Sequence, residues 1–140
     1  MEPKELVREA LRGLDQPGGE GFLALLSDDA ELVSPLATVR GPDEIREFIS
    51  GMHATFSDWE HAVTLESAGD VVVAEGTWSG THTGPMPSPT GEIPPTGRRP
   101  TIPFAGIVRV REGRIASVHN YFDQIAFMTK LGLMPEPATA

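Results

Sequence analysis

The chain has 140 residues, of which 39% are hydrophobic and 22% are charged, and its formal net charge is −9. This balance predicts one soluble globular domain over residues 1–140 and argues against nucleic acid or a membrane surface as a partner. The absence of cysteine excludes disulfides, thiolate nucleophiles and thiolate metal sites. There is no apolar run of membrane-spanning length, and the N-terminus is charged throughout, unlike a secretory signal. We therefore expect a cytoplasmic protein.

The first part of the chain has the periodicity of helices. Apolar residues recur at helical spacing over residues 3–16, and Pro17 with the glycines after it would end that helix. A second, short helix is predicted over residues 20–27, and a short strand over residues 30–36. A third helix is predicted from Gly41 to about residue 55, because a proline and two acidic residues suit its first turn.

From residue 58 onward the pattern changes to that of strands. Odd-numbered apolar and aromatic residues alternate with polar ones over residues 59–66, which predicts a half-buried strand. A long strand is predicted over residues 71–83. Residues 101–111 and 114–123 are predicted to pair as a hairpin across a Glu-Gly turn. A closing helix is predicted over residues 124–131.

The segment of residues 84–100 carries six prolines and three glycines. Proline has no N–H to donate, so this segment cannot form a continuous strand pairing. Long irregular connections inside a compact domain are functional or disordered. We interpret the segment as a lid over one end of the sheet, and the alternative is a surface excursion without function.

Helices followed by strands indicate an α+β domain. The expected architecture is a cone in which a curved antiparallel sheet wraps around three N-terminal helices, with a short C-terminal helix. A pocket is expected to open at the wide end of this cone.

The strongest candidates for chemistry lie near the end of the chain. His119, Tyr121 and Asp123 are spaced two residues apart on a predicted strand, so their side chains share one face. We predict that this face lines a pocket in which protons are moved. Asp123 is the main catalytic candidate, and its alternative role is the N-cap of the closing helix. For His119 the alternative is a partly exposed position, and for Tyr121 it is a core residue.

Further residues are candidates for binding a substrate. Trp59 and Phe104 would form apolar walls for a flat ligand, although aromatic residues in strands also belong to ordinary cores. Trp78 shares a face of the long strand with His82 and is a further candidate for binding the substrate. His82 would lie at the pocket mouth and position a carbonyl group, or be satisfied by the backbone. No histidine spacing typical of a metal site occurs, and we expect neither a metal nor a cofactor.

Four stretches of sequence carry a family likeness: SDDAELVSP, GPDEIREFI, GTHTG with PPTGRR, and REGRIASVHNYFDQIAFMTKLGL. They resemble the SnoaL-like polyketide cyclases of the NTF2-like superfamily. The resemblance implies a cone-shaped NTF2-like (cystatin-like) fold and a homodimer formed through the open sheet face. It also implies a carboxylate at the end of the last strand that acts as general acid and base in an intramolecular aldol condensation.

Asp123 stands at the position that matches this carboxylate. The family cyclases also place a histidine on the preceding strand, and this sequence has Gly106 there, next to the pocket-facing slot of Phe104. The sequence therefore departs from the cyclase pattern at Gly106, and His119 is our candidate to replace the missing group.

Three functions follow as hypotheses. The first is a cofactor-free cyclase or isomerase for a hydrophobic, polyketide-like carbonyl compound that can enolise. In it Asp123 removes a proton, and Tyr121, His119 or His82 stabilises the enolate. The second is a non-catalytic protein that binds a small molecule, favoured if Asp123 contacts only backbone amides in a dry cavity. The third is an epoxide hydrolase that uses Asp123 and Arg109, although Arg109 is expected to face away from the pocket.

Overall fold

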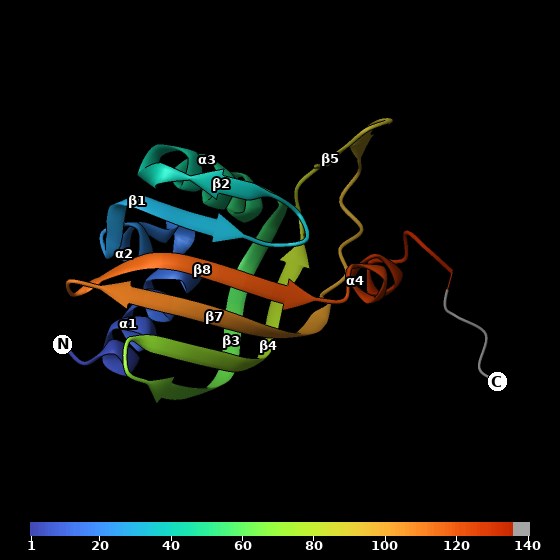
Figure 1. Ribbon diagram of the computed structural model, residues 1–140. Coiled ribbons are helices and arrows are strands. Elements are labelled where there is room, and N and C mark those ends of the chain that lie inside the picture. Colours follow the sequence, from blue (N-terminus) through green and yellow to red (C-terminus); the bar gives the residue numbers. More distant parts are fainter. Residues whose placement is uncertain (136–140) are drawn as a thin grey trace.

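The computed structural model describes residues 1–135. One curved sheet of six strands has helices α1, α2 and α3 on its concave side, and α4 lies beyond one end of it (Figure 1). In chain order the elements are α1 (Pro3–Asp15), a 3₁₀ turn η1 (Pro17–Gly19), α2 (Glu20–Leu23), β1 (Leu26–Val33), β2 (Thr38–Arg40), α3 (Gly41–Thr55), β3 (Phe56–Ala68), β4 (Val71–His82), β5 (Met86–Ser88), β6 (Gly91–Ile93), β7 (Thr101–Arg111), β8 (Arg114–Phe122) and α4 (Gln124–Lys130).

The order of the strands in the sheet is β2-β1-β8-β7-β4-β3. All neighbours are antiparallel except β1 and β8, which run parallel. The prediction of a wholly antiparallel sheet is therefore wrong at this pair. Most of the chain separates β1 from β8, and such a long connection allows a parallel neighbour where a tight hairpin does not.

Most elements lie where the sequence places them. The hairpin of β7 and β8 turns at Glu112 and Gly113, whose φ angles of 52° and 74° suit a two-residue turn. Several elements differ. The strand expected over residues 30–36 begins earlier, since β1 runs from Leu26 to Val33, and the two short strands β5 and β6 were not predicted. The second helix was expected to reach residue 27, but α2 ends at Leu23, because Leu26 begins β1 and is buried in the sheet. The short edge strand β2 was not predicted.

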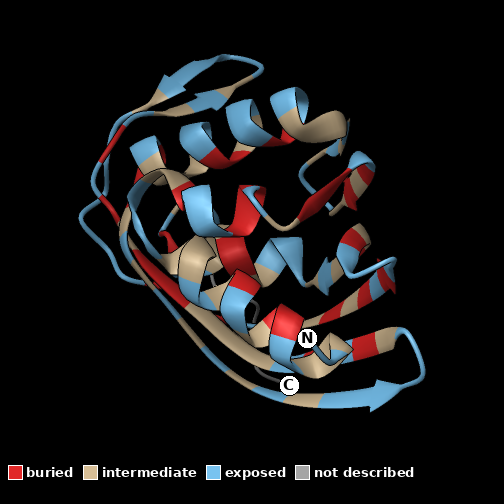
Figure 2. Cartoon of the chain, turned by 90° about the vertical axis from the view of Figure 1, so that its left-hand side faces the viewer, coloured by how far each residue is buried: buried red, intermediate tan, exposed pale blue. Residues whose placement is uncertain are grey.

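Two apolar clusters form the core. The larger cluster joins α1 and α3 to the concave face of the sheet, and it includes Leu6, Ile45 and Val72. The smaller cluster lies near α4 and contains Phe56, Ile102, Phe127 and Leu131. Figure 2 shows the buried residues gathered where the helices face the sheet. Phe127 and Leu131 are one helical turn apart, so together they hold α4 against the rest of the domain.

The segment of residues 84–100 is an ordered excursion. It contains the two-stranded β5–β6 hairpin, and its start is fixed by the amides of Thr83 and Gly84, which both donate to the Thr55 carbonyl at 3.0 Å. Its end is fixed along β4, where the His82 amide donates to the Arg98 carbonyl at 2.8 Å. Within residues 1–135, no helix is long and apolar enough to cross a membrane.

Candidate functional site

A cavity of about 120 Å³ lies between the helices and the concave face of the sheet. Its wall is apolar and rich in aromatic side chains, and Trp59 and Trp78 meet there edge to face with ring centroids 5.7 Å apart. Phe48, Phe104, Phe122 and Phe127 complete the aromatic part of the wall. Apart from the indole groups, the polar side chains of the lining are those of Ser34, His61 and Asn120.

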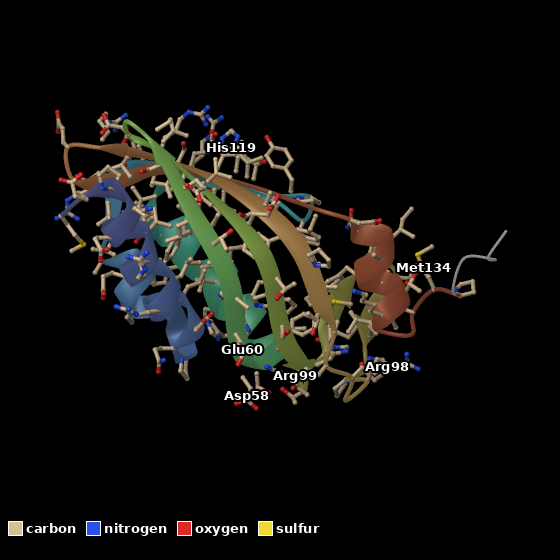
Figure 3. All side chains as sticks on the ribbon, turned by 90° about the horizontal axis from the view of Figure 1, so that it is seen from below. Asp58, Glu60, Arg98, Arg99, His119 and Met134 are labelled. Atoms are coloured by element: carbon tan, nitrogen blue, oxygen red, sulfur yellow. The ribbon has the colours of Figure 1, made fainter. Side chains whose placement is uncertain are left out.

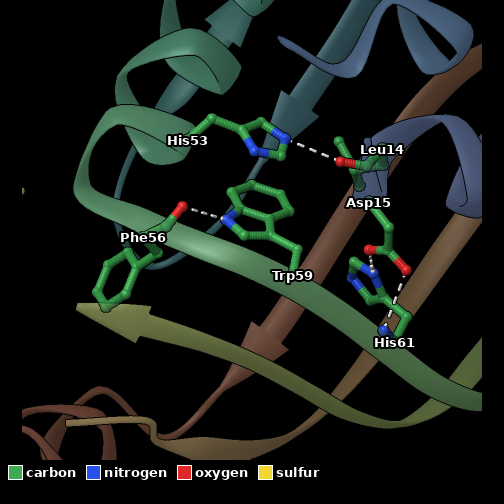
Figure 4. Close-up of polar contacts among 6 residues, drawn as sticks. All are labelled: Leu14, Asp15, His53, Phe56, Trp59 and His61. Atoms are coloured by element: carbon green, nitrogen blue, oxygen red, sulfur yellow. Dashed lines mark hydrogen bonds and ion pairs between the residues drawn. The ribbon is translucent and has the colours of Figure 1, made fainter. Parts of the chain in front are cut away.

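His61 is paired with Asp15 at the wall of this cavity. The Nδ1 atom of His61 lies 2.5 Å from Oδ1 of Asp15, and the backbone N–H of His61 donates to Oδ2 of Asp15 at 3.2 Å (Figure 4). The side chain of His61 is only 9% exposed. An ionised carboxylate only accepts hydrogen bonds, so the proton of the neutral imidazole lies on Nδ1. No hydrogen bond to Nε2 is present within residues 1–135, so in this tautomer Nε2 is able to accept a proton.

A bulge in β3 directs His61 inward. Between Ser57 and Glu60 the strand has one more residue than the facing part of β4, and Asp58 takes a φ of 54°. A bulge of this kind shifts the alternation of side chains by one position. Phe56 before the bulge and Trp59 and His61 after it consequently all reach the interior.

Asp15 occupies an electrostatically unfavourable position at the last residue of α1. A negative charge at a helix C-terminus opposes the helix dipole, at a cost of about 0.3–1 kcal/mol. The two hydrogen bonds to His61 offset this cost. They also tie the end of α1 to β3 and hold the imidazole in one orientation.

Asn120 is the second polar group that faces the cavity. It lies on β8 directly opposite Gly106 of β7. A Cβ atom at Gly106 would lie 2.7 Å from Oδ1 of Asn120, so the glycine makes room for the carboxamide. Gly106 stands where the family cyclases have a histidine, and here the side chain of Asn120 on β8 occupies the space beside it.

The face of His119, Tyr121 and Asp123 does not line the cavity, so this prediction is wrong. β8 contains an irregularity in which Val110 pairs with Ile115 and Arg109 pairs with Ser117. The extra residue reverses the alternation, so Asn120 and Phe122 face inward instead.

The two residues of that face on β8 lie on the convex side of the sheet. His119 points away from the helices (Figure 3), and its Nε2 lies 3.4 Å from Oε1 of Glu31. Tyr121 is 56% exposed.

Asp123 acts as the N-cap of α4. It is exposed, and its Oδ1 accepts a hydrogen bond from the Ala126 amide at 3.0 Å. The capping alternative is confirmed.

The other predicted residues divide into two groups. Trp59, Trp78 and Phe104 stand in the cavity wall as expected, and Gly106 lines a smaller cavity behind it. His82 is fully buried and lines neither cavity. Its Nδ1 accepts a hydrogen bond from the Thr96 amide at 3.1 Å, and burial lowers its pKa. His82 therefore anchors the 84–100 segment, which likewise contributes nothing to the wall.

Trp59 is held rigidly by groups that the sequence did not single out. The ring of His53 stacks on it with centroids 3.9 Å apart, and the indole N–H donates to the Phe56 carbonyl at 2.9 Å (Figure 4). Nε2 of His53 lies 2.9 Å from the Leu14 carbonyl. Burial lowers the pKa of His53, which keeps the ring neutral with Nε2–H as the donor.

No cluster of three or more acidic or histidine side chains suited to a metal ion occurs within residues 1–135. The lining of the cavity contains no aspartate or arginine among these residues, and Arg109 is exposed on the opposite face. The arrangement can therefore perform proton transfer at His61 and hydrogen bonding at Asn120.

Comparisons with known proteins agree with this architecture. A candidate SnoaL-like polyketide cyclase from Jannaschia sp. CCS1 has 20% identity and a TM-score of 0.82, over 95% of this chain and 93% of that chain. A hypothetical protein with a ketosteroid isomerase-like fold from Catenulispora acidiphila has 20% identity and a TM-score of 0.78, over 96% of this chain and 98% of that one. An epoxide hydrolase from M. tuberculosis has 20% identity and a TM-score of 0.72, over 93% and 89%.

These likenesses establish the α+β NTF2-like fold that the sequence predicts. A search of curated proteins gives no match. The model of the SnoaL-like domain matches residues 7–118, which is more than half of the sequence. The chain therefore belongs to the SnoaL-like family of the NTF2-like superfamily.

Proposed function

We propose that this protein is a cofactor-independent enzyme that moves a proton at a carbon next to a carbonyl group of a small apolar substrate. The observation that carries the proposal is the Asp15–His61 pair in the wall of an aromatic cavity. A neutral histidine whose second nitrogen is held by a carboxylate is a competent general base. Family membership supports the substrate class, because a structural neighbour is a candidate polyketide cyclase.

The proposed reaction gives each group one task. Nε2 of His61 takes the proton from the α-carbon, and the electrons of the broken C–H bond form the enolate. Asp15 keeps Nδ1 protonated and stabilises the imidazolium that results. The amide N–H of Asn120 donates to the developing enolate oxygen. If a C=C bond is conjugated with the enolate, the imidazolium returns its proton to the far carbon of the dienolate, which isomerises the substrate. Alternatively, the enolate attacks a second carbonyl carbon and closes a ring, and the imidazolium protonates the alkoxide that results.

The size of the cavity limits the substrate. A cavity of about 150 Å³ in a protein core binds one benzene molecule. The cavity here, at about 120 Å³, is suited to a single ring and not to a fused polycyclic compound. We therefore infer a substrate with one ring or a short chain in this part of the site.

The test is exchange of the α-protons of a phenyl alkyl ketone in deuterated water, followed by NMR. The wild-type protein is expected to accelerate exchange, and His61→Gln is expected to abolish the acceleration. Asn120→Leu should retain part of it, because the base is still present. Thermal unfolding of each variant shows whether it is folded. Equal exchange in wild type and folded His61→Gln would refute the proposal.

A second function, binding without catalysis, is favoured by one observation. Asp123, the carboxylate at the family position, contacts a backbone amide and lies outside the cavity wall. If the protein is a carrier, the same ketones should bind, as detected by chemical-shift changes, with no exchange above the buffer rate.

We also propose a homodimer formed through the convex face of the sheet, which family resemblance supports. That face exposes apolar surface at Tyr121 (56% exposed) and Val73 (40% exposed). Light scattering after gel filtration measures the mass directly. A dimer is expected at micromolar concentration, and a monomer at all concentrations would contradict this proposal.

A further inference from the structure

A second cavity of about 60 Å³ lies behind the first, between the helices and the sheet. The two cavities share five lining residues, namely Leu14, Leu32, His61, Phe104 and Asn120. These shared residues form the partition between an outer and an inner chamber. Both polar groups of the proposed reaction therefore lie at the junction.

The two chambers differ in chemistry. The outer chamber has five aromatic residues besides Phe104, and its other unshared apolar residues are aliphatic. The aromatic ones are Phe48, Trp59, Trp78, Phe122 and Phe127, and the aliphatic ones are Leu36, Ile49, Met52 and Ile102. The inner chamber is mainly aliphatic, and its own lining residues are Val7, Ala10, Leu11, Ala74, Val108, Ile115 and Val118, together with Phe22 and Gly106. Flat rings pack well against aromatic faces, whereas an aliphatic wall offers only apolar contact.

Phe104 is the bulkiest residue of the partition. Its ring meets the imidazole of His61 edge to face, with centroids 5.7 Å apart and an interplanar angle of 76°. The next inward position of the same strand is Gly106, which leaves the inner chamber open beside the carboxamide of Asn120. The ring of Phe104 thus separates the two chambers next to both reacting groups.

We propose that the two chambers form one bipartite site for an aryl alkyl ketone, and that Phe104 sets the length of the alkyl group. The aryl ring occupies the outer chamber, the carbonyl group lies at the junction, and the alkyl group enters the inner chamber. The position of the carbonyl rests on the proposed function, but the selection of alkyl length does not.

The volume of the inner chamber sets the expected length. A water molecule occupies about 30 Å³, and a methyl group is of similar size. A chamber of about 60 Å³ therefore holds an alkyl group of about two carbons. Each methylene buried in it should strengthen binding about fourfold, until the chamber is full.

The experiment is an NMR titration with acetophenone, propiophenone, butyrophenone, valerophenone and hexanophenone. For wild type, affinity is expected to rise to propiophenone or butyrophenone and then to fall. Phe104→Ala widens the passage between the chambers and enlarges the space for the alkyl group, so it should move the optimum to a longer chain. Phe104→Leu should give a smaller shift of the optimal alkyl length. It replaces the alanine variant in this test if that variant does not fold. Phe122→Ala is the matched control, because Phe122 lines only the outer chamber. It should weaken all five ketones and keep the optimum.

Affinity that ignores chain length in wild type would overturn the inference, and so would an unchanged optimum in folded Phe104 variants. The exchange assay separates this inference from the proposed function. Length-dependent binding without exchange would retain the bipartite site and reject the catalytic role of His61. Exchange of α-protons without any dependence of binding on chain length would retain the catalytic role of His61 and reject the bipartite site.

Discussion

Replacing Asp15 with asparagine removes the charge that orients His61 and keeps the shape of the side chain. Asp15 offers two oxygens to two donors, the ring Nδ1–H and the backbone N–H of His61. Asparagine has one oxygen and one NH₂ group, so it can accept from only one of them. If the NH₂ group faces the ring, it donates to Nδ1 and moves the imidazole proton to Nε2. The base then becomes a donor.

The expected loss of rate in Asp15→Asn follows from these contacts. A hydrogen bond to a charged group contributes about 1.5–3 kcal/mol and a neutral one about 0.5–1.5 kcal/mol. The loss for one weakened bond is therefore about 1–1.5 kcal/mol, which is about tenfold in rate. The change of tautomer adds to this loss, because the reactive form becomes the minor one. We expect α-proton exchange to fall by about 10- to 100-fold in Asp15→Asn.

Two measurements check this prediction. The exchange assay gives the rate, and ¹⁵N NMR of the imidazole gives the tautomer, a readout that a purely structural role of Asp15 would not move. Asp29→Asn is the matched control, since Asp29 is a carboxylate paired with Arg111 on the surface. The Asp29→Asn variant should accelerate exchange of the α-protons of the ketone as much as the wild-type protein does. An unchanged rate and an unchanged tautomer in Asp15→Asn would refute the role of the pair.

Three further predictions concern the surroundings of the site. Burial lowers the pKa of His82 below 6.5, so the unfolded chain binds more protons in acid and the free energy of unfolding should fall from pH 7 to pH 5. Urea titrations should show a smaller fall in His82→Asn, by at most about 1.4 kcal/mol per pH unit, and an identical pH dependence would contradict this assignment. Asp123→Ala removes a helix cap and should cost about 1 kcal/mol in the same titrations without changing ketone exchange. Gly106→Ala places a methyl group against Asn120 and should weaken binding of propiophenone more than of acetophenone; equal weakening would argue against an alkyl chamber there.

The fold could be predicted because its local signals agree with its packing. The spacing of apolar residues over α1 and α3 matches the faces that are buried, and the Glu-Gly turn matches the hairpin. The parallel pair of β1 and β8 could not be predicted in the same way. It depends on how distant parts of the chain assemble, which no local pattern records.

The site was predicted on the wrong face for a local reason. Counting along β8 in steps of two places His119 and Tyr121 with the buried Ile115, but the irregularity near residue 116 reverses the count. On β3 the alternation itself was correct, and it placed His61 on the buried side with Trp59. Its partner Asp15 is 46 residues away in the sequence, so only the assembled structure brings the pair together.

The most direct test of this account compares His61→Gln with Asp123→Asn in the exchange assay. Asp123 has the position expected from family resemblance, and His61 has the position in the cavity wall. We predict that folded His61→Gln loses the acceleration of α-proton exchange and that Asp123→Asn keeps the wild-type rate. Loss of exchange in Asp123→Asn with full exchange in His61→Gln would contradict the assignment of the site.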